Sequence, residues 1–441
     1  MHDRVCAVVL CLVWVAELVL IATPVPALAL ALAGAAALAA FLVLAAMRKG
    51  GHIRALFVVV VAASAAMAWW NEVPQALWHG FERAQIFGAF LPSVLLLRAT
   101  VESSPRLERL RGRFERLDPA TSQNSTLYGS HVLGSVLNVG AMSILAPIVA
   151  RDAGDGQRRL LASSSVRGVG TAVMWSPFFV AIAFSSQLVP QAPAWQVMAV
   201  GVGLTAIGLA LSHLLYTPAL GRAGFVDSVA QLRPLVGPTI VIVASVVGAS
   251  VALGLNGLQS VAVVVPVFCV AYAAALGGRA ARRIARRTFE SFAKLADELF
   301  IVVGATILAV TVSALPAVQS LGASMTPGMI SGVALMASVI FTLVGFGLAG
   351  LHPMIGIGIL LPVLAAGDFG IHPAVLVATA VFSWGLSASI SMWTLPLVSA
   401  SIHFGVPVRE LFTRRSLAYG LLYATGGILY LGAVNAVLGP A

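Results

Sequence analysis

The chain has 441 residues, of which 59% are hydrophobic and only 10% charged, and its mean hydropathy is +0.98. These values exclude a soluble protein and predict an all-α polytopic membrane protein, because each crossing needs about 20 apolar residues. The net charge of +10 does not indicate nucleic-acid binding. The basic residues lie in short loops between apolar segments, where the positive-inside rule already explains them.

The cysteines Cys6, Cys11 and Cys269 lie in apolar runs and form no CxxC pair. Neither a metal site nor a disulfide framework is indicated, and we expect no cofactor. The first apolar run, residues 5–21, follows MHDR and resembles a signal peptide. Because a second apolar run follows almost at once, we expect the first run to be retained as a membrane span.

The first part of the chain, residues 1–118, predicts four spans. A TPVP turn joins the first two spans, and the basic loop RKGGHIR after them predicts a cytoplasmic N-terminus. The aromatic-rich connector NEVPQALWHGF suits the outer interface, and a loop with six arginines, residues 98–118, returns the chain to the cytoplasm as a mixed-charge surface helix. The four spans are residues 5–21, 27–47, 55–70 and 85–97.

The next segment, residues 121–150, is apolar but has arginine-rich loops on both sides, RLERLRGRFER and RDAGDGQRR. Both flanks are then cytoplasmic, which a single crossing does not allow. We therefore predict a re-entrant hairpin that turns back at residues 137–140. Non-helical backbone at that depth is tolerated where it lines a cavity, so Asn138 and Gly140 are candidate substrate-binding residues. His131, Ser135 and Ser143 also lie on this hairpin.

The remaining chain predicts seven more spans and a second hairpin, residues 328–366, which turns at residues 350–353. The strongly basic segment GRAARRIARR is expected to be a cytoplasmic loop. In total we expect one membrane domain with about eleven spans and two hairpins, divided into segments 1–118, 119–216, 217–316 and 317–441. The seven spans are residues 166–188, 195–216, 235–255, 261–276, 299–316, 374–401 and 417–438.

An internal repeat supports this layout. NVGAMSILAP, then MWSPFF, then Val189-Pro190 in the first copy correspond to HPMIGIGILLP, then MWTLPL, then Val406-Pro407 in the second. Each copy covers about fifty residues, a length typical of a structural repeat. The predicted topology inserts the two copies in opposite directions. Inverted repeats with interrupted hydrophobic segments are typical of secondary transporters.

Two prolines predict interrupted helices. Pro177 and Pro396 lack an N–H group, so the carbonyls of Val173 and Met392 lose their usual donors. A helix broken there would expose carbonyls to a coupling cation and N–H groups to an anion. A simple proline kink is the alternative.

Three polar side chains beside these features are further candidates for the site. Ser176 and Thr394 would supply hydroxyls at the two breaks. His352 lies at the turn of the second hairpin, and because histidine titrates near neutral pH we predict that it carries the coupling proton. The alternatives are a helix-entry histidine bonded to backbone and, for Asn138, a purely interhelical contact. Arg167 lies about 13 Å along its helix from Ser176, so we assign it to the cytoplasmic end of the span.

Eleven spans with opposed hairpins after the fourth and ninth resemble the ion transporter superfamily, with the divalent anion/sodium symporters and the membrane subunit of TRAP carboxylate transporters as nearest likenesses. Symporter hairpin tips carry Ser-Asn-Thr; here they read Leu137-Asn138-Val139 and Leu351-His352-Pro353, so Asn138 alone matches. The resemblance implies an elevator-type motion. Dimers are common in those families, so a homodimer is a further expectation.

These observations predict a secondary active transporter of a small organic anion in the bacterial inner membrane. Its expected partners are the anionic substrate, the lipid bilayer and a coupling ion, with a proton preferred over sodium because the Ser-Asn-Thr signatures are missing. The alternatives are an inorganic oxyanion transporter, a metabolite exporter, a channel or an intramembrane enzyme acting on lipid. An enzyme is disfavoured, because the sequence has no HExxH, no GxSxG and no paired intramembrane carboxylates.

Overall fold

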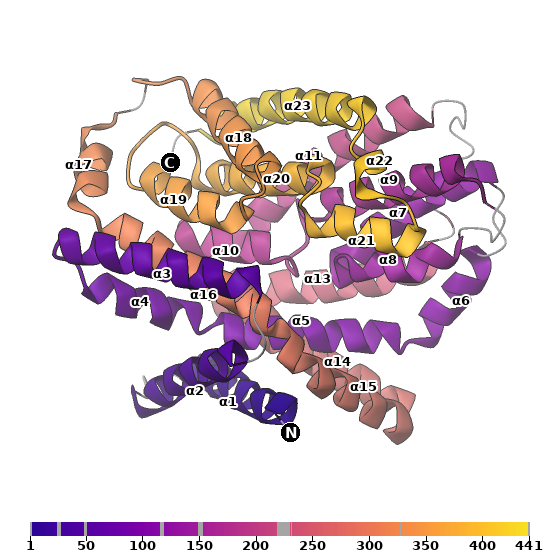
Figure 1. Ribbon diagram of the computed structural model, residues 1–441, viewed down its shortest axis with the longest axis horizontal. Coiled ribbons are helices and arrows are strands. Elements are labelled where there is room, and N and C mark those ends of the chain that lie inside the picture. The colour runs from indigo at the N-terminus through magenta and orange to yellow at the C-terminus, as the bar shows by residue number, and fades with distance from the viewer. Residues whose placement is uncertain are drawn as a thin grey trace. The chain divides into compact units, whose positions relative to one another are not determined.

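In the computed structural model every secondary-structure element of the described residues is a helix (Figure 1). The structure describes residues 2–23, 28–47, 51–114, 119–148, 153–217, 230, 232–326 and 328–439. Most of the TPVP turn and parts of the loops that contain Arg48, Arg116, Arg151 and Arg222 lie outside the described residues.

Ten helices within these ranges are long and apolar enough to cross a membrane. The prediction of an all-α polytopic membrane protein is therefore confirmed. The expected eleventh span, residues 166–188, is not among these ten. Its helix is interrupted between residues 172 and 180.

The chain forms two compact units that alternate along the sequence. Unit 1 contains Met1–Ser103, Ser245–Met325 and Gly358–Asp368. Within it α1 packs on α2 and α5, α14 packs on α5, and α16 packs on α3 and α4. Its helices are α1 (His2–Ala22), α2 (Leu28–Ala46), α3 (His52–Trp70), α4 (Gln75–Ala84), α5 (Phe87–Glu102), α14 (Gly257–Leu276), α15 (Gly278–Ser291), η3 (Phe292–Leu295), α16 (Ala296–Ala314) and α17 (Pro316–Ser324).

Two segments of unit 1 that we expected to be loops are helices. The aromatic connector after α3 is mostly α4, which packs closely on α16: a Cβ at Gly80 would lie 2.7 Å from the Cα of Ile307. The basic segment at the middle of the chain is α15, which buries Ile284 and Thr288. In both cases tertiary packing of one helix face outweighs a composition that suggested a loop.

Unit 2 contains Ser104–Ala244, Thr326–Ile357 and Phe369–Ala441. Two helices, α13 (Arg233–Leu253) and α19 (Pro353–Ala365), are divided between the units. The other helices of unit 2 are α6 (Pro105–Phe114), α7 (Pro119–Leu137), α8 (Gly140–Leu145), η1 (Ala146–Ile148), α9 (Asp155–Ala172), α10 (Val180–Leu188), α11 (Ala194–Tyr216), α18 (Gly332–Leu348), α20 (Pro373–Ile390), α21 (Leu395–Phe404), α22 (Val408–Leu411) and α23 (Arg414–Leu438).

Helix α20 lies at the centre of unit 2, where it packs on α9, α11, α18 and α23. Its face joins a buried apolar cluster that includes Phe382, Leu386 and Tyr423. Glycines allow the closest approaches: a Cβ at Gly385 would lie 2.9 Å from the carbonyl oxygen of Gly170 on α9. This packing holds the ends of α9 and α20, where both helices are interrupted, within one rigid core.

Candidate functional site

Two helices of unit 2 are interrupted in the same manner. Helix α9 ends at Ala172 and α10 begins at Val180, which leaves residues 173–179 as the first break. Helix α20 ends at Ile390 and α21 begins at Leu395, which leaves residues 391–394 as the second break. Backbone groups at such breaks have no partner within the helix and are free to bind a ligand or another side chain.

The two prolines stand differently at their breaks. Pro177 lies inside the first break, whereas Pro396 lies in the first turn of α21, where a missing N–H group removes no helical hydrogen bond. Pro396 therefore starts a helix and does not interrupt one. Within the described ranges no donor reaches the carbonyl oxygens of Val173 and Met392, so both remain available to a cation.

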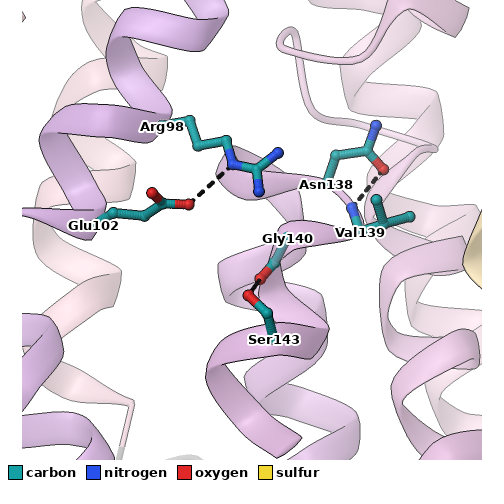
Figure 2. A network of polar contacts seen from close by, with 6 residues as sticks. All are labelled: Arg98, Glu102, Asn138, Val139, Gly140 and Ser143. Carbon is teal, nitrogen blue, oxygen red and sulfur yellow. Dashed lines mark hydrogen bonds and ion pairs between the residues drawn. The ribbon is translucent and has the colours of Figure 1, made fainter. Parts of the chain in front are cut away.

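A tight turn precedes each interrupted helix. In the first, Asn138 joins α7 to α8 with a left-handed backbone (φ 53°). Its side-chain Oδ1 accepts a hydrogen bond of 2.8 Å from the N–H of Val139, and Ser143 Oγ donates to the carbonyl of Gly140 at 2.8 Å (Figure 2). Asn tolerates this backbone because its short side chain bonds locally. Asn138 thus shapes the turn, and its exposed Nδ2 stays free to contact a ligand.

In the second turn, between α18 and α19, the left-handed residue is Gly350 (φ 87°). Gly350 is therefore the geometric counterpart of Asn138, and the alignment that paired Asn138 with His352 is corrected. His352 stands just before α19, where its Nδ1 accepts a hydrogen bond of 3.3 Å from the N–H of Met354. Its ring meets Trp384 edge to face, with centroids 5.7 Å apart. The hydrogen bond from the N–H of Met354 is the one expected of a histidine at the start of a helix.

A buried serine joins the first break to the first turn. Ser176 Oγ donates to the carbonyl of Ser135, three residues before Asn138, and accepts from the N–H of Phe178 at 3.3 Å. Ser176 is fully buried. The bond holds the break against the hairpin arm α7.

The second break repeats this arrangement. Ser391 Oγ donates to the carbonyl of Gly347 at 2.7 Å, three residues before Gly350, and accepts from the N–H of Trp393 at 3.4 Å. We name the two bonds, Ser176 to Ser135 and Ser391 to Gly347, the serine latches. Ser391, and not Thr394, is therefore the counterpart of Ser176. Thr394 Oγ1 instead donates to the carbonyl of Ala388 in α20 at 3.1 Å and to that of Ser391 in the break at 2.8 Å.

His131 of α7 makes a second connection to the first break. Trp175 Nε1 donates to His131 Nε2 at 3.2 Å, and His131 Nδ1 lies 3.0 Å from Thr171 Oγ1, which donates to the carbonyl of Gly168 at 2.9 Å. Since Nε2 accepts, the proton of the neutral ring sits on Nδ1. The sequence showed only that His131 lies on the hairpin. It showed no sign that Trp175 of the repeated Met-Trp pair would reach it.

Arg167 is not at an exposed end of its span. It is 3% exposed, and its Nε and one terminal nitrogen donate to Ser212 Oγ at 2.8 Å and Ser164 Oγ at 3.0 Å. Its guanidinium carbon lies 3.6 Å from the centre of the Tyr216 ring. Residues of α11 and α23 cover Arg167, so it is a packed side chain, and its place at the cytoplasmic end of the span stays a prediction.

No protein-family model and no curated protein matches the chain. Solved structures do. The YdaH transporter of Alcanivorax borkumensis is similar with a TM-score of 0.56 and 16% identity, covering 88% of this chain and 100% of that one. MtrF of Neisseria gonorrhoeae, from a class of antimetabolite efflux pumps, is similar with a TM-score of 0.53 and 13% identity, covering 87% of this chain and 95% of that one. The chain shares the fold of these membrane transporters.

Proposed function

We propose that the protein is a secondary active transporter that moves a small organic anion across the bacterial inner membrane, with its N-terminus in the cytoplasm. The observation that carries the proposal is the recurrence, in unit 2, of an interrupted helix latched by a serine to the turn before it. Interrupted helices of this kind bind substrate and coupling ion near the middle of the membrane in many transporters.

The backbone at the two breaks supports an anionic substrate. Helices α10 and α21 begin at the breaks, and their first N–H groups carry partial positive charge that favours an anion. The free carbonyl oxygens of Val173 and Met392 offer the opposite charge to a cation. Asn138, Gly140, Ser176, His352 and Thr394 are the side chains and backbone that we assign to substrate binding around these groups.

Similar structures favour transport over the rival classes. The two similar structures reported above are a transporter and a member of a class of efflux pumps. The layout of spans and hairpins resembles the ion transporter superfamily, and we further propose that the protein belongs to it. We also propose that the protein transports its substrate by an elevator-type movement. Because MtrF is an efflux pump, export of a metabolite on this scaffold is the second candidate function.

We assign the coupling proton to His352. In the neutral ring Nδ1 accepts the N–H of Met354, so the ring proton is on Nε2. A second proton on Nδ1 would remove that bond at the start of α19. Proton binding and the shape of the second turn are thereby linked. Sodium held by the free carbonyls of Val173 and Met392 is the alternative.

Uptake into proteoliposomes tests this proposal. Vesicles with purified protein and an imposed pH gradient should accumulate a small carboxylate saturably, and vesicles loaded with the same carboxylate should show counterflow. His352→Gln should abolish the gradient-driven part, and counterflow should persist with a weaker apparent affinity for the carboxylate, because His352 is also assigned to substrate binding. His403→Gln, which alters an exposed histidine of α21, is the matched control. Gradient-driven uptake by His352→Gln at the wild-type rate would refute proton coupling there, and a linear, non-saturable flux would refute the transporter.

A further inference from the structure

Five arginines form one face of helix α15. They follow one another at intervals of three and four residues, and residues at these intervals lie side by side on a helix surface. All five side chains are exposed. We name this face the arginine stripe. Its members are Arg279, Arg282, Arg283, Arg286 and Arg287.

The opposite face of α15 holds the helix in unit 1. It buries Ile284 and Thr288, and the helix packs on α14, α5 and α1. With 3.6 residues per turn, Ile284 lies about 140° around the helix axis from Arg279, and Thr288 lies about 180° from it. The arginine stripe therefore points away from the packed side of a helix that is held in place by other residues.

Carboxylates offset little of the charge of the arginine stripe. Residues 277–289 contain none, and the next after Glu290 are Asp297 and Glu298, which follow η3 at the start of α16. Within the described chain the only ion pair of α15 joins Arg286 to Glu290 at 3.7 Å, with the two side chains 73% and 63% exposed. Such exposed pairs contribute little, so the stripe presents net positive charge to its surroundings.

Helix α15 begins where a candidate membrane span ends. The span α14 ends at Leu276, and Gly277, with a φ of 92° that suits glycine, turns the chain into α15. Arg279 is three residues beyond α14, about 4.5 Å of helix, and lipid headgroups occupy roughly 5 to 8 Å outside the hydrocarbon. The partly exposed Tyr272 near the end of α14 suits the same depth, because tyrosines concentrate at membrane interfaces.

The chemistry of the arginine stripe suits phosphate groups. A planar guanidinium donates two parallel hydrogen bonds to a phosphate, and basic clusters next to a membrane span attract anionic lipid. We propose that the arginine stripe is a docking surface for anionic phospholipid of the membrane that holds the protein. The place of the stripe at the end of a span favours lipid over an acidic protein. This inference goes beyond the proposed transport function, which requires no particular lipid.

Thermal unfolding of the full chain in an uncharged detergent, titrated with phosphatidylglycerol, tests the docking surface. Phosphatidylcholine, which has a phosphate but no net charge, is the lipid control. We expect a saturable rise in melting temperature with phosphatidylglycerol and a much smaller one with phosphatidylcholine. The triple variant Arg279→Gln, Arg283→Gln and Arg287→Gln should raise the half-saturating concentration by at least about tenfold, because each arginine near an anionic surface contributes to binding.

The matched control is the triple variant Arg109→Gln, Arg409→Gln and Arg414→Gln. It removes the same charge from exposed arginines of three different helices, α6, α22 and α23, and should bind phosphatidylglycerol as the wild type does. Equal losses in the two triple variants would show that net charge alone attracts the lipid and would overturn the docking surface. Wild-type affinity in the α15 variant would overturn it as well.

Measurements on the wild-type protein do not depend on how the variants fold. Raising the salt concentration from about 0.1 M to about 1 M shortens the screening length from about 10 Å to about 3 Å and should remove most of the phosphatidylglycerol effect. A shift that salt does not change would overturn the inference. Stabilisation by polyglutamate or by inorganic phosphate, without stabilisation by phosphatidylglycerol, would overturn the assignment to lipid. Equal shifts with phosphatidylglycerol and phosphatidylcholine would overturn the role of charge.

Discussion

The two serine latches should contribute unequally to stability, although they look alike. In the first, the carbonyl of Ser135 receives no other donor, because the N–H of Val139 is bonded to Asn138 Oδ1. In the second, the carbonyl of Gly347 also accepts the N–H of Gly350 at 3.1 Å. Ser176→Ala therefore leaves a buried carbonyl without a donor, whereas Ser391→Ala does not.

The expected costs follow from this difference. Interhelical side-chain hydrogen bonds in membrane proteins average about 0.6 kcal/mol, and a buried polar group left unsatisfied costs about 1 to 3 kcal/mol. Ser391→Ala should therefore lower the free energy of unfolding by about 0.6 to 1 kcal/mol, and Ser176→Ala by about 2 to 3 kcal/mol.

Reversible unfolding by SDS in mixed micelles measures these values. The matched control is Ser143→Ala, because Ser143 Oγ bonds only to the carbonyl of Gly140 on its own helix, and such local changes stay within about 0.5 kcal/mol. Equal costs for the two latch variants, or a Ser176→Ala value no larger than the control, would refute the reasoning.

Three further predictions concern the same core. Gly201→Ala would place a Cβ against a backbone carbonyl of the first break and should lower the unfolding free energy by about 1 to 3 kcal/mol. Its control is Gly237→Ala, whose Cβ would face open space and should not destabilise the protein. Equal SDS midpoints for the two variants would contradict this prediction. Asn138→Val should cost about 1 to 2 kcal/mol through the left-handed backbone, and Asn138→Gly much less, in the same titration. A double-mutant cycle of Trp175→Phe and His131→Phe should give a coupling of about 0.6 kcal/mol or more; additivity would refute the observed bond.

Composition and local chemistry were enough for the class of the protein and for where its helices are interrupted. Long apolar runs have one stable outcome in a bilayer, because helices satisfy every backbone hydrogen bond internally. Proline marked the first break at Pro177. At the second break, Pro396 indicated the correct region of the chain, but the predicted cause was wrong. Pro396 does not interrupt a helix, since a proline in a first turn begins one.

The partners of side chains were not predictable from the sequence. The repeated Met-Trp pair aligned Ser176 with Thr394, but the shared contact belongs to Ser391, because a latch depends on where a carbonyl of another helix lies. In the sequence His352 occupied the place in the second turn that Asn138 occupies in the first, but Gly350 holds the equivalent backbone conformation.

The sequence by itself determined an all-helical membrane protein and marked its first helix break at Pro177, because hydrophobicity and proline act locally along the chain. Only the tertiary structure decided that Arg167 lies buried beside the second break. Distance along one helix placed it far from the first break, whereas the packing of α9 on α20 and α21 set its real neighbours. Charges are placed by contacts between segments distant in sequence, and no periodicity along a single segment records those contacts.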